Sequence, residues 1–396
     1  DLKIEGIRDI TQKDITKAKD NGDTIKLIAS VNDMAKVEPV TISKNDPMSV
    51  TGALCSVKFI SEFAGEEVII GKGAGGMETA SAMIRDLVEI KQKNEGLGMK
   101  IVLKFGGTSV GNGKKIDNVC NIIQKVKKDN QVIVVSSALQ STTDELLELS
   151  EDAKKGQINE KIINEISQRH RDAIKDIIKD KEIQNEVFKV VEELIEDLKK
   201  TVDGVIIVKE LSDKTQDKIV AFGERLAVTI ISGKLRDMGI KSKSFTGGEA
   251  GIMTDDNFGN ASPLMKVTQH NVKNNLSDLI EEIIPVVTGF IGTTQQGDIS
   301  TLGRGGSDFS ASLIGMCLNV DEIWFMTDVD GLLTANPKIY PKAKTIPQLS
   351  YNEAVEMATM GAKGMHARAL EPAKIANIPV RIKNTFRPDV EGTLIN

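Results

Sequence analysis

The pattern of apolar and polar positions changes near residue 94, and this change divides the chain into two regions. In the first region, short helical and extended stretches follow one another. The pattern predicts helices over 11–20 and 78–93 and strands over 25–31 and 67–70. The segment 94–98, which contains two glycines, is typical of a short joint. We therefore place a domain boundary there, with one domain over 1–96 and a second over 99–396.

Beyond the joint, apolar runs of strand length alternate with helical stretches. Strands are predicted over 101–105, 205–208, 285–291 and 322–326, and helices over 219–238, 309–317 and 351–360. The charge-rich stretch 144–200 also reads as helix, with one apolar stripe formed by Val187, Val190, Val191, Leu194 and Leu198. This alternation predicts an α/β fold, a three-layer sandwich with a mostly parallel sheet. The first region is a small α+β segment.

Composition and charge exclude several classes of protein. The 51 Lys and Arg against 57 Asp and Glu give a net charge of −6 without a basic block, so we expect no nucleic-acid partner. Apolar runs stay shorter than the roughly 18 residues of a membrane span, so we expect no membrane partner. Cys55, Cys120 and Cys317 are far apart and odd in number, which favours a reducing cytoplasm over a disulfide framework. Because residue 1 is Asp and no leader pattern precedes it, we expect a trimmed chain or a fragment.

The first candidate for chemistry is the sequence KFGGTS, which starts at Lys104 at the end of a predicted strand. In parallel sheets, ligands bind beyond the carboxyl ends of the strands. Gly106 and Gly107 let backbone amides approach an anion, and Lys104 adds a positive charge, as a transferring phosphoryl group requires. A tight turn with an exposed lysine fits the same spacing equally well.

The second candidate is TLGRGGSD over 301–308, directly before a predicted apolar helix. Its glycines, the helix N-terminus and Arg304 together form an anion site, because unpaired amides and the helix dipole both favour negative charge. Asp308 alone would explain a simple N-cap. The six polar or glycine residues exceed what a cap needs, so we favour a functional site.

Acidic side chains mark two further positions. Thr327 and Asp328 follow the strand 322–326 and suit a magnesium-bound nucleotide, although an acidic type I turn has the same pattern. Glu224 lies in the sequence FGER, in a helix that is apolar on one side. A buried glutamate needs a cationic partner, which the ammonium group of an amino acid, Arg225 or a lysine would supply.

Other motifs carry less weight. The sequence 71–76 matches G-x-G-x-x-G, but the next strand ends in Lys104 rather than in the acid that binds a ribose. An oxidoreductase that uses NADP through this motif is therefore the least favoured alternative. The stretch 65–73 fails as a P-loop because Gly73 stands where Ser or Thr is required. The three histidines, His170, His270 and His366, are not spaced for a zinc site or a Ser-His-Asp triad.

Taken together, several segments resemble the aspartokinases of the amino acid kinase family, over about 99–396. They are KFGGTS at Lys104, SALQSTTDEL at Ser137, FGER at Phe222, GF-x-G at Gly289, TLGRGGSD at Thr301, TDVDG at Thr327 and GAKGMH at Gly361. The resemblance implies the amino acid kinase fold and an aspartate kinase. Such an enzyme uses ATP and Mg²⁺ to phosphorylate the side-chain carboxylate of L-aspartate, giving 4-phospho-L-aspartate for lysine, threonine and methionine synthesis. It also implies a homodimer, because members of the family generally self-associate.

The positions of these motifs imply three sets of site residues. The catalytic set is Lys104, Gly106, Gly107, Ser109 and Asp308. The substrate-binding set is Thr143, Glu224, Arg304 and Ser307, with Arg304 on the α-carboxylate and Glu224 on the ammonium group. The ATP-binding set is Lys104, Thr327, Asp328, Lys338 and Lys363, and no residue is assigned as a metal ligand. With a pKa of about 3.9, the acceptor carboxylate is already ionised at neutral pH and needs no general base.

The chain departs from the family pattern in three places. Ser141 stands where the family usually has Gly, and Ala335-Asn336-Pro337-Lys338 stands for the usual A-D-P-R. The chain stops at Asn396, where paired regulatory ACT domains are expected to follow. Because lysine lacks the planar fork of arginine, Asn336 and Lys338 motivate one alternative, a catalytically weak regulatory subunit. Another kinase of the same fold is the second alternative, against which Glu224 and Arg304 argue for an amino acid substrate.

The leading segment resembles the C-terminal end of homoserine dehydrogenase. The likeness lies in GIRDIT at Gly6, IKLIA at Ile25 and the stretch 71–82, where Lys72 replaces a usual proline. The dinucleotide domain and catalytic lysine of that family precede this part, so we expect no dehydrogenase activity. The hypothesis is a longer chain with dehydrogenase first and kinase second, or two adjacent genes read together before Met99.

Overall fold

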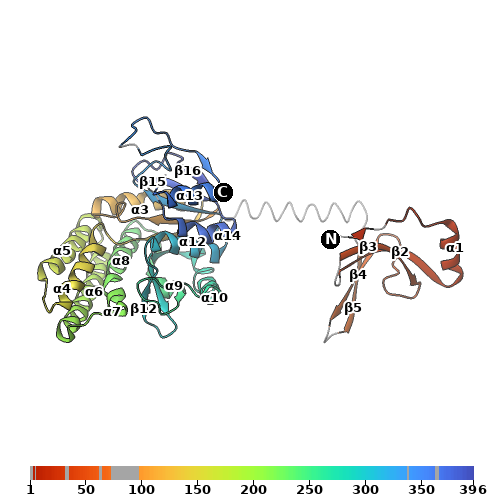
Figure 1. The fold of residues 1–396 in the computed structure, drawn as a ribbon, viewed down its shortest axis with the longest axis horizontal. Coiled ribbons are helices and arrows are strands. Elements are labelled where there is room, and N and C mark those ends of the chain that lie inside the picture. The colour runs from red at the N-terminus through yellow and green to blue at the C-terminus, as the bar shows by residue number, and fades with distance from the viewer. Residues whose placement is uncertain are drawn as a thin grey trace. The chain divides into compact units, whose positions relative to one another are not determined.

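The computed structural model divides the chain into two compact units, Asp1–Gly96 and Leu97–Asn396 (Figure 1). It describes residues 3–4, 6–31, 35–61, 65–72, 98–336, 339–361 and 365–396. The predicted helix 78–93 and most of the glycine motif 71–76 therefore lie outside the described residues.

The first unit holds a small sheet, one helix and a separate hairpin. Its elements are β1 (Lys3–Ile4), α1 (Gln12–Asp20), β2 (Asp23–Val31), β3 (Ala35–Ser43), β4 (Leu54–Ser61) and β5 (Gly65–Lys72). The strand order β1-β3-β2 forms the sheet, and β4 pairs antiparallel with β5. Helix α1 begins at a capping box, in which Thr11 accepts a hydrogen bond from the Asp14 amide and donates its own amide to the Asp14 carboxylate. The predicted helix 11–20 and strands 25–31 and 67–70 are confirmed.

The second unit is built on an eight-stranded sheet in the order β14-β16-β15-β13-β6-β7-β10-β8. The strands are β6 (Lys100–Phe105), β7 (Gln131–Ser136), β8 (Ser242–Phe245), β10 (Ile284–Thr288), β13 (Glu322–Thr327), β14 (Gln348–Leu349), β15 (Val380–Asn384) and β16 (Thr393–Ile395). Neighbouring strands are parallel except β15 and β16. The carboxyl ends of β6, β7, β10 and β13 therefore meet at one edge of the sheet.

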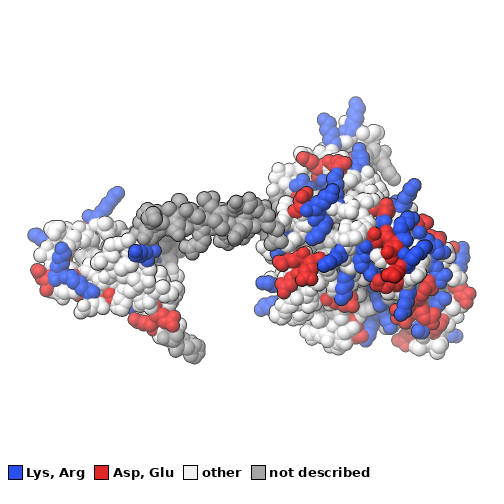
Figure 2. All heavy atoms as spheres, turned by 180° about the vertical axis from the view of Figure 1, so that it is seen from behind, with Lys and Arg blue, Asp and Glu red and all other residues white. Residues whose placement is uncertain are grey.

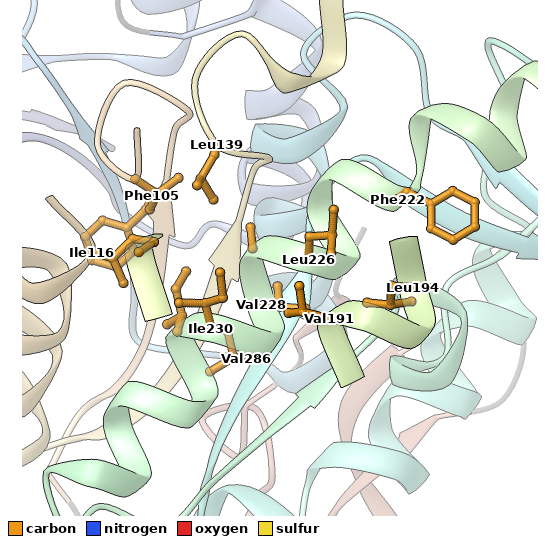
Figure 3. Close-up of a cluster of buried hydrophobic side chains, with 14 of the residues drawn as sticks. Phe105, Ile116, Leu139, Val191, Leu194, Phe222, Leu226, Val228, Ile230 and Val286 are labelled. Atoms are coloured by element: carbon orange, nitrogen blue, oxygen red, sulfur yellow. The ribbon is translucent and has the colours of Figure 1, made fainter. Parts of the chain in front are cut away.

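Helices cover both faces of this sheet. They are α3 (Gly113–Lys127), α4 (Thr142–Lys154), α5 (Glu160–Ile177), α6 (Lys181–Val208), α7 (Asp213–Val220), α8 (Phe222–Asp237), α9 (Gly247–Ala250), α10 (Met265–Leu276), α11 (Leu279–Glu282), α12 (Gly306–Leu318), α13 (Tyr351–Thr359), η1 (Ala367–Leu370) and α14 (Glu371–Ala376). Successive residues of a strand face opposite ways, so Phe105 of β6 packs in a core with α3, α6 and α8 (Figure 3), while Val102 joins a second core with α10, α12 and α14. The predicted three-layer α/β sandwich is confirmed.

The second unit also contains a three-stranded sheet. Its order is β12-β11-β9, from β9 (Met253–Thr254), β11 (Ile291–Thr294) and β12 (Ile299–Thr301). The predicted strand 285–291 is thus two strands, β10 and β11. They are separated where Phe290 adopts a positive φ of 69°.

The predicted strand 205–208 is wrong, because these residues are the last turn of α6. The run is rich in β-branched residues, which favour strands locally. However, the buried stripe of α6 continues through Val202 and Val205 at helical spacing, so packing decides the structure. The helix ends at Lys209, which has a φ of 56° and donates its amide to the Val205 carbonyl. Val190, placed in the stripe by the sequence pattern, is 36% exposed and lies at its border.

The surface shows both signs of charge. Figure 2 presents one face of the second unit, on which Lys and Arg side chains are intermixed with Asp and Glu over the helices. None of the helices in the described part of the chain combines the length and apolar character needed to cross a bilayer.

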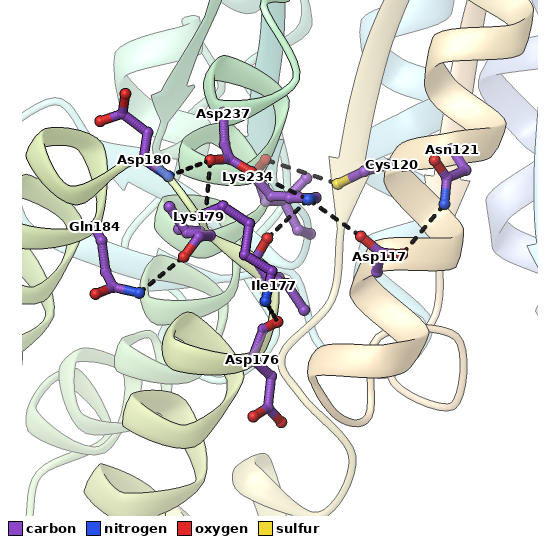
Figure 4. Close-up of polar contacts among 12 residues, drawn as sticks. Asp117, Cys120, Asn121, Asp176, Ile177, Lys179, Asp180, Gln184, Lys234 and Asp237 are labelled. Atoms are coloured by element: carbon purple, nitrogen blue, oxygen red, sulfur yellow. Dashed lines mark hydrogen bonds and ion pairs between the residues drawn. The ribbon is translucent and has the colours of Figure 1, made fainter.

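A buried lysine joins three segments beside the first core (Figure 4). Lys234 of α8 is 8% exposed and donates to the Ile177 carbonyl at 2.7 Å. Its Nζ also pairs with Asp237 at 3.1 Å and with Asp117 of α3 at 3.2 Å. Asp237 in turn accepts hydrogen bonds from the backbone amides of Lys179 and Asp180, both at 2.8 Å. This network fixes the link between α5 and α6 to α8 and α3.

Replacing Lys234 with methionine should lower the free energy of unfolding by about 3 kcal/mol, because removing one partner of a buried ion pair leaves the other charge uncompensated. Urea denaturation measures the change. Lys125→Met is the matched control, since Lys125 and Asp389 form an exposed pair in which the side chains keep 71% and 85% of their accessible surface. Its stability should hardly change. Equal losses in the two variants would contradict the prediction.

Candidate functional site

A cavity of about 510 Å³ opens at the carboxyl edge of the large sheet. It is lined by the turns after β6 and β7 and by the N-terminal ends of α8 and α12. It brings together seven of the predicted site residues: Lys104, Gly107, Thr143, Glu224, Arg304, Ser307 and Asp308. These residues are separated by up to about two hundred positions in the sequence, and the parallel topology collects them.

Lys104 and Asp308 form an ion pair within the cavity. Lys104 is the penultimate residue of β6 and Asp308 lies in the first turn of α12, and their charged atoms are 2.5 Å apart. Their side chains are 12% and 14% exposed. A Cβ at Gly106 would lie 3.5 Å from the Lys104 Nζ, and one at Gly107 would lie 3.1 Å from the Ala138 carbonyl. The absence of a side chain at Gly107 thus leaves room for the loop after β7, whereas a Cβ at Gly106 would make only an ordinary contact with the lysine.

The N-terminal end of α12 is shaped by glycines around Arg304. Gly303 and Gly305 have φ values of 74° and 75°, a region that residues with a Cβ rarely adopt. The Arg304 side chain is exposed at the cavity and makes no hydrogen bond or ion pair with any described residue. A Cβ at Gly289 would lie 2.6 Å from the Ser307 Cβ, so glycine is what lets the end of β10 approach α12.

Glu224 is a buried carboxyl group with an unused oxygen. It is 3% exposed, and its Oε1 accepts a hydrogen bond from the Ala138 amide at 3.2 Å. Its Oε2 has no partner among the described residues. Burial raises the pKa of Glu224 to about 8, because desolvation disfavours the charged form. Arg225, one of the partners that the sequence allowed, lies instead over the ring of Phe222, 5.0 Å from its centroid.

Four of the other predicted residues, Gly106, Ser109, Thr327 and Asp328, are described but do not line the cavity. Ser109 is fully buried, and its hydroxyl lies 2.7 Å from the Thr385 hydroxyl and 3.4 Å from the Met326 carbonyl. It thereby ties the turn after β6 to the neighbouring strand ends. Thr327 donates to the Asp328 carboxylate at 3.3 Å, and Asp328 is exposed at the end of β13. Lys338 and Lys363 lie outside the described residues.

Gly259 and Phe290 also line the cavity and belong to none of the predicted sets of site residues. Phe290 belongs to a segment noted for its resemblance, but no local signal shows that its backbone turns left-handed. Gly259 lies in a polar loop without a motif. Its place follows from a distant contact, since its amide donates to the Asp217 carboxylate at 2.9 Å. The described residues hold no group of three or more His, Cys, Asp or Glu side chains arranged around a possible metal ion.

Ser141, which stands where glycine was expected, has a positive φ of 70° at the start of α4 and makes no side-chain cap bond. Ser141→Gly should therefore raise the free energy of unfolding by about 0.5–1 kcal/mol, because glycine adopts this conformation without steric cost. Chemical denaturation measures the gain. Ser137→Gly is the control, since Ser137 lies in the same loop but not at positive φ, and it should lose stability. A gain in both variants would contradict the argument.

Two family models match the chain. The model of the amino acid kinase family matches residues 99–384. The model of homoserine dehydrogenase matches residues 1–88, at the N-terminal end of this chain. The expected resemblances to these two families are thereby confirmed, while the correspondence of the leading segment to the C-terminal end of homoserine dehydrogenase stays a prediction.

Named relatives and solved structures agree with the first match. Aspartokinase 1, chloroplastic, of Arabidopsis thaliana is 34% identical over 335 residues, which cover 82% of this chain and 57% of the relative. A bifunctional aspartokinase/homoserine dehydrogenase of Buchnera aphidicola is 31% identical over 74% of this chain and 36% of its own. The crystal structure of E. coli aspartokinase III with aspartate and ADP aligns with a TM-score of 0.68 and 28% identity, over 74% of this chain and 64% of that one. The chain thus spans less than two thirds of each of these proteins. The structural similarity to aspartokinase III confirms the predicted fold class.

Proposed function

Since the chain belongs to the amino acid kinase family, we propose that it transfers a phosphoryl group from MgATP to the side-chain carboxylate of L-aspartate, forming 4-phospho-L-aspartate. The observation that carries the proposal is that one cavity holds both a carboxylate oxygen and a guanidinium group without a described partner. Glu224 offers a buried, unpartnered carboxylate oxygen, and Arg304 offers an unpaired guanidinium among the described residues. An amino acid presents the complementary ammonium and α-carboxylate groups. The similarity to an aspartokinase solved with aspartate and ADP supports the same assignment.

Each cavity residue has a role that its chemistry allows. Glu224 binds the ammonium group, and Arg304 binds the α-carboxylate through its planar fork. Thr143 and Ser307 offer hydroxyl groups to the substrate. Recognition of both α-substituents leaves the side-chain carboxylate free to react. This carboxylate is ionised at neutral pH, so it attacks the phosphorus without a general base.

The transferring phosphoryl group requires positive charge and oriented donors. Lys104 supplies the charge, and the glycine turn 106–107 allows backbone amides to approach the phosphate oxygens. Asp308 holds the Lys104 ammonium at 2.5 Å and thereby fixes its position in the cavity. Because phosphoryl transfer depends mostly on positioning and electrostatics, these contacts suffice as the core of the machinery.

We assign the nucleotide to the edge of the sheet near the end of β13, with Thr327, Asp328, Lys338 and Lys363 as its proposed contacts. The exposed Asp328 at the carboxyl end of a central strand supports this place. Mg²⁺ accompanies the triphosphate and neutralises part of its charge. We assign no residue of the chain as its ligand.

We further propose that the chain is part of a bifunctional dehydrogenase and kinase protein, with domains over 1–96 and 99–396. The match of residues 1–88 to homoserine dehydrogenase supports it, as does the bifunctional relative. The cytoplasmic location and the homodimer stay predictions.

Hydroxylamine trapping of the acyl phosphate tests the proposed function. The chain is incubated with ATP, Mg²⁺ and L-aspartate, and parallel samples contain succinate, which lacks the ammonium group. Hydroxamate from L-aspartate with at most a trace from succinate is the expected result. No hydroxamate from a folded chain that binds MgATP would contradict an aspartate kinase, and it would favour the regulatory-subunit alternative.

A further inference from the structure

Asp217 of α7 is a buried acid that touches the cavity only through other residues. It is 3% exposed, and both of its carboxylate oxygens accept hydrogen bonds. Oδ2 accepts from the backbone amides of Thr301 at 2.8 Å and Gly259 at 2.9 Å, and Oδ1 accepts from the Thr301 hydroxyl at 2.7 Å. Burial raises its pKa, while these hydrogen bonds oppose the rise. Three donors therefore converge on one side chain.

The partners of Asp217 lie beside the substrate groups. Thr301 ends β12 and directly precedes residues 302–305, which we name the Arg304 turn. Gly259 lines the cavity itself, as do Gly303, Arg304 and Gly305 of the turn. The turn contains two glycines at positive φ, so its backbone has more freedom than an ordinary turn and needs fixing from outside.

A second side chain holds the first residue of the Arg304 turn and the loop that contains Gly259. Arg368 of η1 donates to the Leu302 carbonyl at 3.0 Å and to the Asn260 Oδ1 at 3.4 Å. Its guanidinium also lies 4.5 Å from the centroid of the Phe309 ring in α12. Asp217 thus holds Thr301, the residue directly before the Arg304 turn, and Arg368 holds the carbonyl of Leu302, the first residue of the turn. Neither side chain lines the cavity.

We propose that Asp217 is a positioning residue, which fixes the Arg304 turn so that Arg304 meets the α-carboxylate of the substrate. The inference rests on the proposed function for the identity of that substrate. Under this inference, a residue outside the cavity also determines the affinity for the amino acid. Asp217 is then distinct in its role from the groups that bind the phosphates.

Two substitutions of Asp217 separate the role of its acceptors from the role of its charge. Leucine has a similar volume but accepts no hydrogen bond. Asparagine keeps one oxygen for the two amides and turns its NH₂ toward the Thr301 hydroxyl, which rotates to accept. If Asp217 acts by its acceptors, Asp217→Asn should retain function and Asp217→Leu should lose it.

Steady-state kinetics give the main readout. Asp217→Leu should raise KM for L-aspartate about 10–100-fold, with kcat and KM for ATP changed by less than about twofold, because uniform binding of the substrate is lost. Asp217→Asn should stay within about threefold of the parent in all three constants. A KM for L-aspartate that is unchanged in Asp217→Leu would overturn the proposal.

A double-mutant cycle tests whether Asp217 acts through Arg304. In an Arg304→Ala background, Asp217→Leu should change KM for L-aspartate by less than about twofold, because the group that it positions is already gone. If the increase in KM of the double variant equals the product of the increases in the two single variants, Asp217 acts independently of Arg304, and the inference is overturned. If Asp217→Leu does not fold, Thr301→Val removes one of the three donors, and its smaller rise in KM should likewise vanish in the Arg304→Ala background.

Asp237 provides the matched control for general destabilisation. Its side chain is 6% exposed and also accepts two backbone amides, and Asp237 lies 13 residues from Glu224 on α8, about 20 Å along the helix. Asp237→Leu should lower stability without raising KM for L-aspartate. If KM for L-aspartate rises as much in Asp237→Leu as in Asp217→Leu, general loosening of the fold explains both effects, and the proposal is overturned.

Hydrogen exchange of the substrate-free chain keeps this inference separate from the proposed function. In Asp217→Leu, the amides of Thr301 and Gly259 should exchange at least about tenfold faster than in the parent, while amides of β6 stay protected. A parent that forms no hydroxamate would contradict the proposed function alone. Unchanged exchange at Thr301 would overturn the role of Asp217 whatever the activity of the parent.

Discussion

Replacing Lys104 with alanine is expected to lower kcat for acyl phosphate formation by about 1,000-fold, because the variant loses the positive charge that faces the transferring phosphoryl group. The lysine is held by Asp308 at 2.5 Å in a largely enclosed position, where screening by water is weak. The variant also leaves the Asp308 carboxylate unpaired in the cavity, which repels the phosphates. Hydroxamate formation at saturating L-aspartate and MgATP measures the effect.

Two further lysine variants show whether the loss is specific. Lys104→Arg keeps the charge but not the shape, so it should recover part of the activity. Lys234→Met removes a lysine that is also buried and ion-paired but lies near the C-terminal end of α8, away from the cavity. Its kcat should stay near that of the parent at a temperature where the variant is folded. A Lys104→Ala variant with more than about a tenth of the parent kcat would refute the assigned role.

The second large effect concerns pH and Glu224. Since burial raises the pKa of Glu224 to about 8, the ligand-free carboxyl group is mostly neutral at pH 7. An ammonium group binds the ionised form, so kcat/KM for L-aspartate should rise roughly tenfold per pH unit between pH 6 and 8 and then level off. Glu224→Gln should abolish this rise and increase KM for L-aspartate at pH 8 by about 100-fold.

Succinate, tested as a competitive inhibitor, is the control for this prediction because it lacks the ammonium group. Its inhibition constant should not improve as the pH rises from 6 to 8. A kcat/KM for L-aspartate that is flat over this range, or a rise that persists in Glu224→Gln, would show that another group governs the pH dependence.

The same group affects stability with a definite sign. The folded pKa of Glu224 lies above the unfolded value of 4.5, so the folded chain binds more protons between pH 4.5 and about 8. Its contribution to stability is therefore complete at low pH and is lost as the pH rises through this window. Relative to the parent, the free energy of unfolding of Glu224→Gln should increase from pH 5 to pH 8. Paired thermal or urea melts at the two pH values measure the difference.

The regular elements were largely predictable because each has a local cause. The strand β6 and the helix α12 follow from continuous apolar runs of the right length and from the glycines at the start of the helix. The failure at Val205–Val208 has a tertiary cause, since the buried stripe of α6 overrides the strand preference of β-branched residues.

The candidate site was predictable only where motifs carried it. Lys104, Glu224 and Arg304 were named from the sequence, and the parallel sheet brings them to one cavity. The ion pair between Lys104 and Asp308 and the contact of Asp217 with Thr301 were not, because each joins residues that are more than eighty positions apart. Ser109 was placed in the catalytic set from its motif, and no local signal indicated that its hydroxyl would lie 2.7 Å from the Thr385 hydroxyl, in the interior and 276 positions away.

The strand order of the large sheet has a consequence for how the chain is made. β6 is the first strand of its unit, yet one of its two neighbours is β13, which pairs Ile101 with Glu322, 221 residues later. At about 5–20 residues per second, a ribosome needs roughly 11–44 s to reach that partner. Until then β7 covers one side of β6, and the other side presents an open strand edge of largely apolar residues. The edge of β6 that pairs with β13 in the folded chain therefore stays open for most of the time that the second unit is being translated, and an open strand edge favours association between nascent chains.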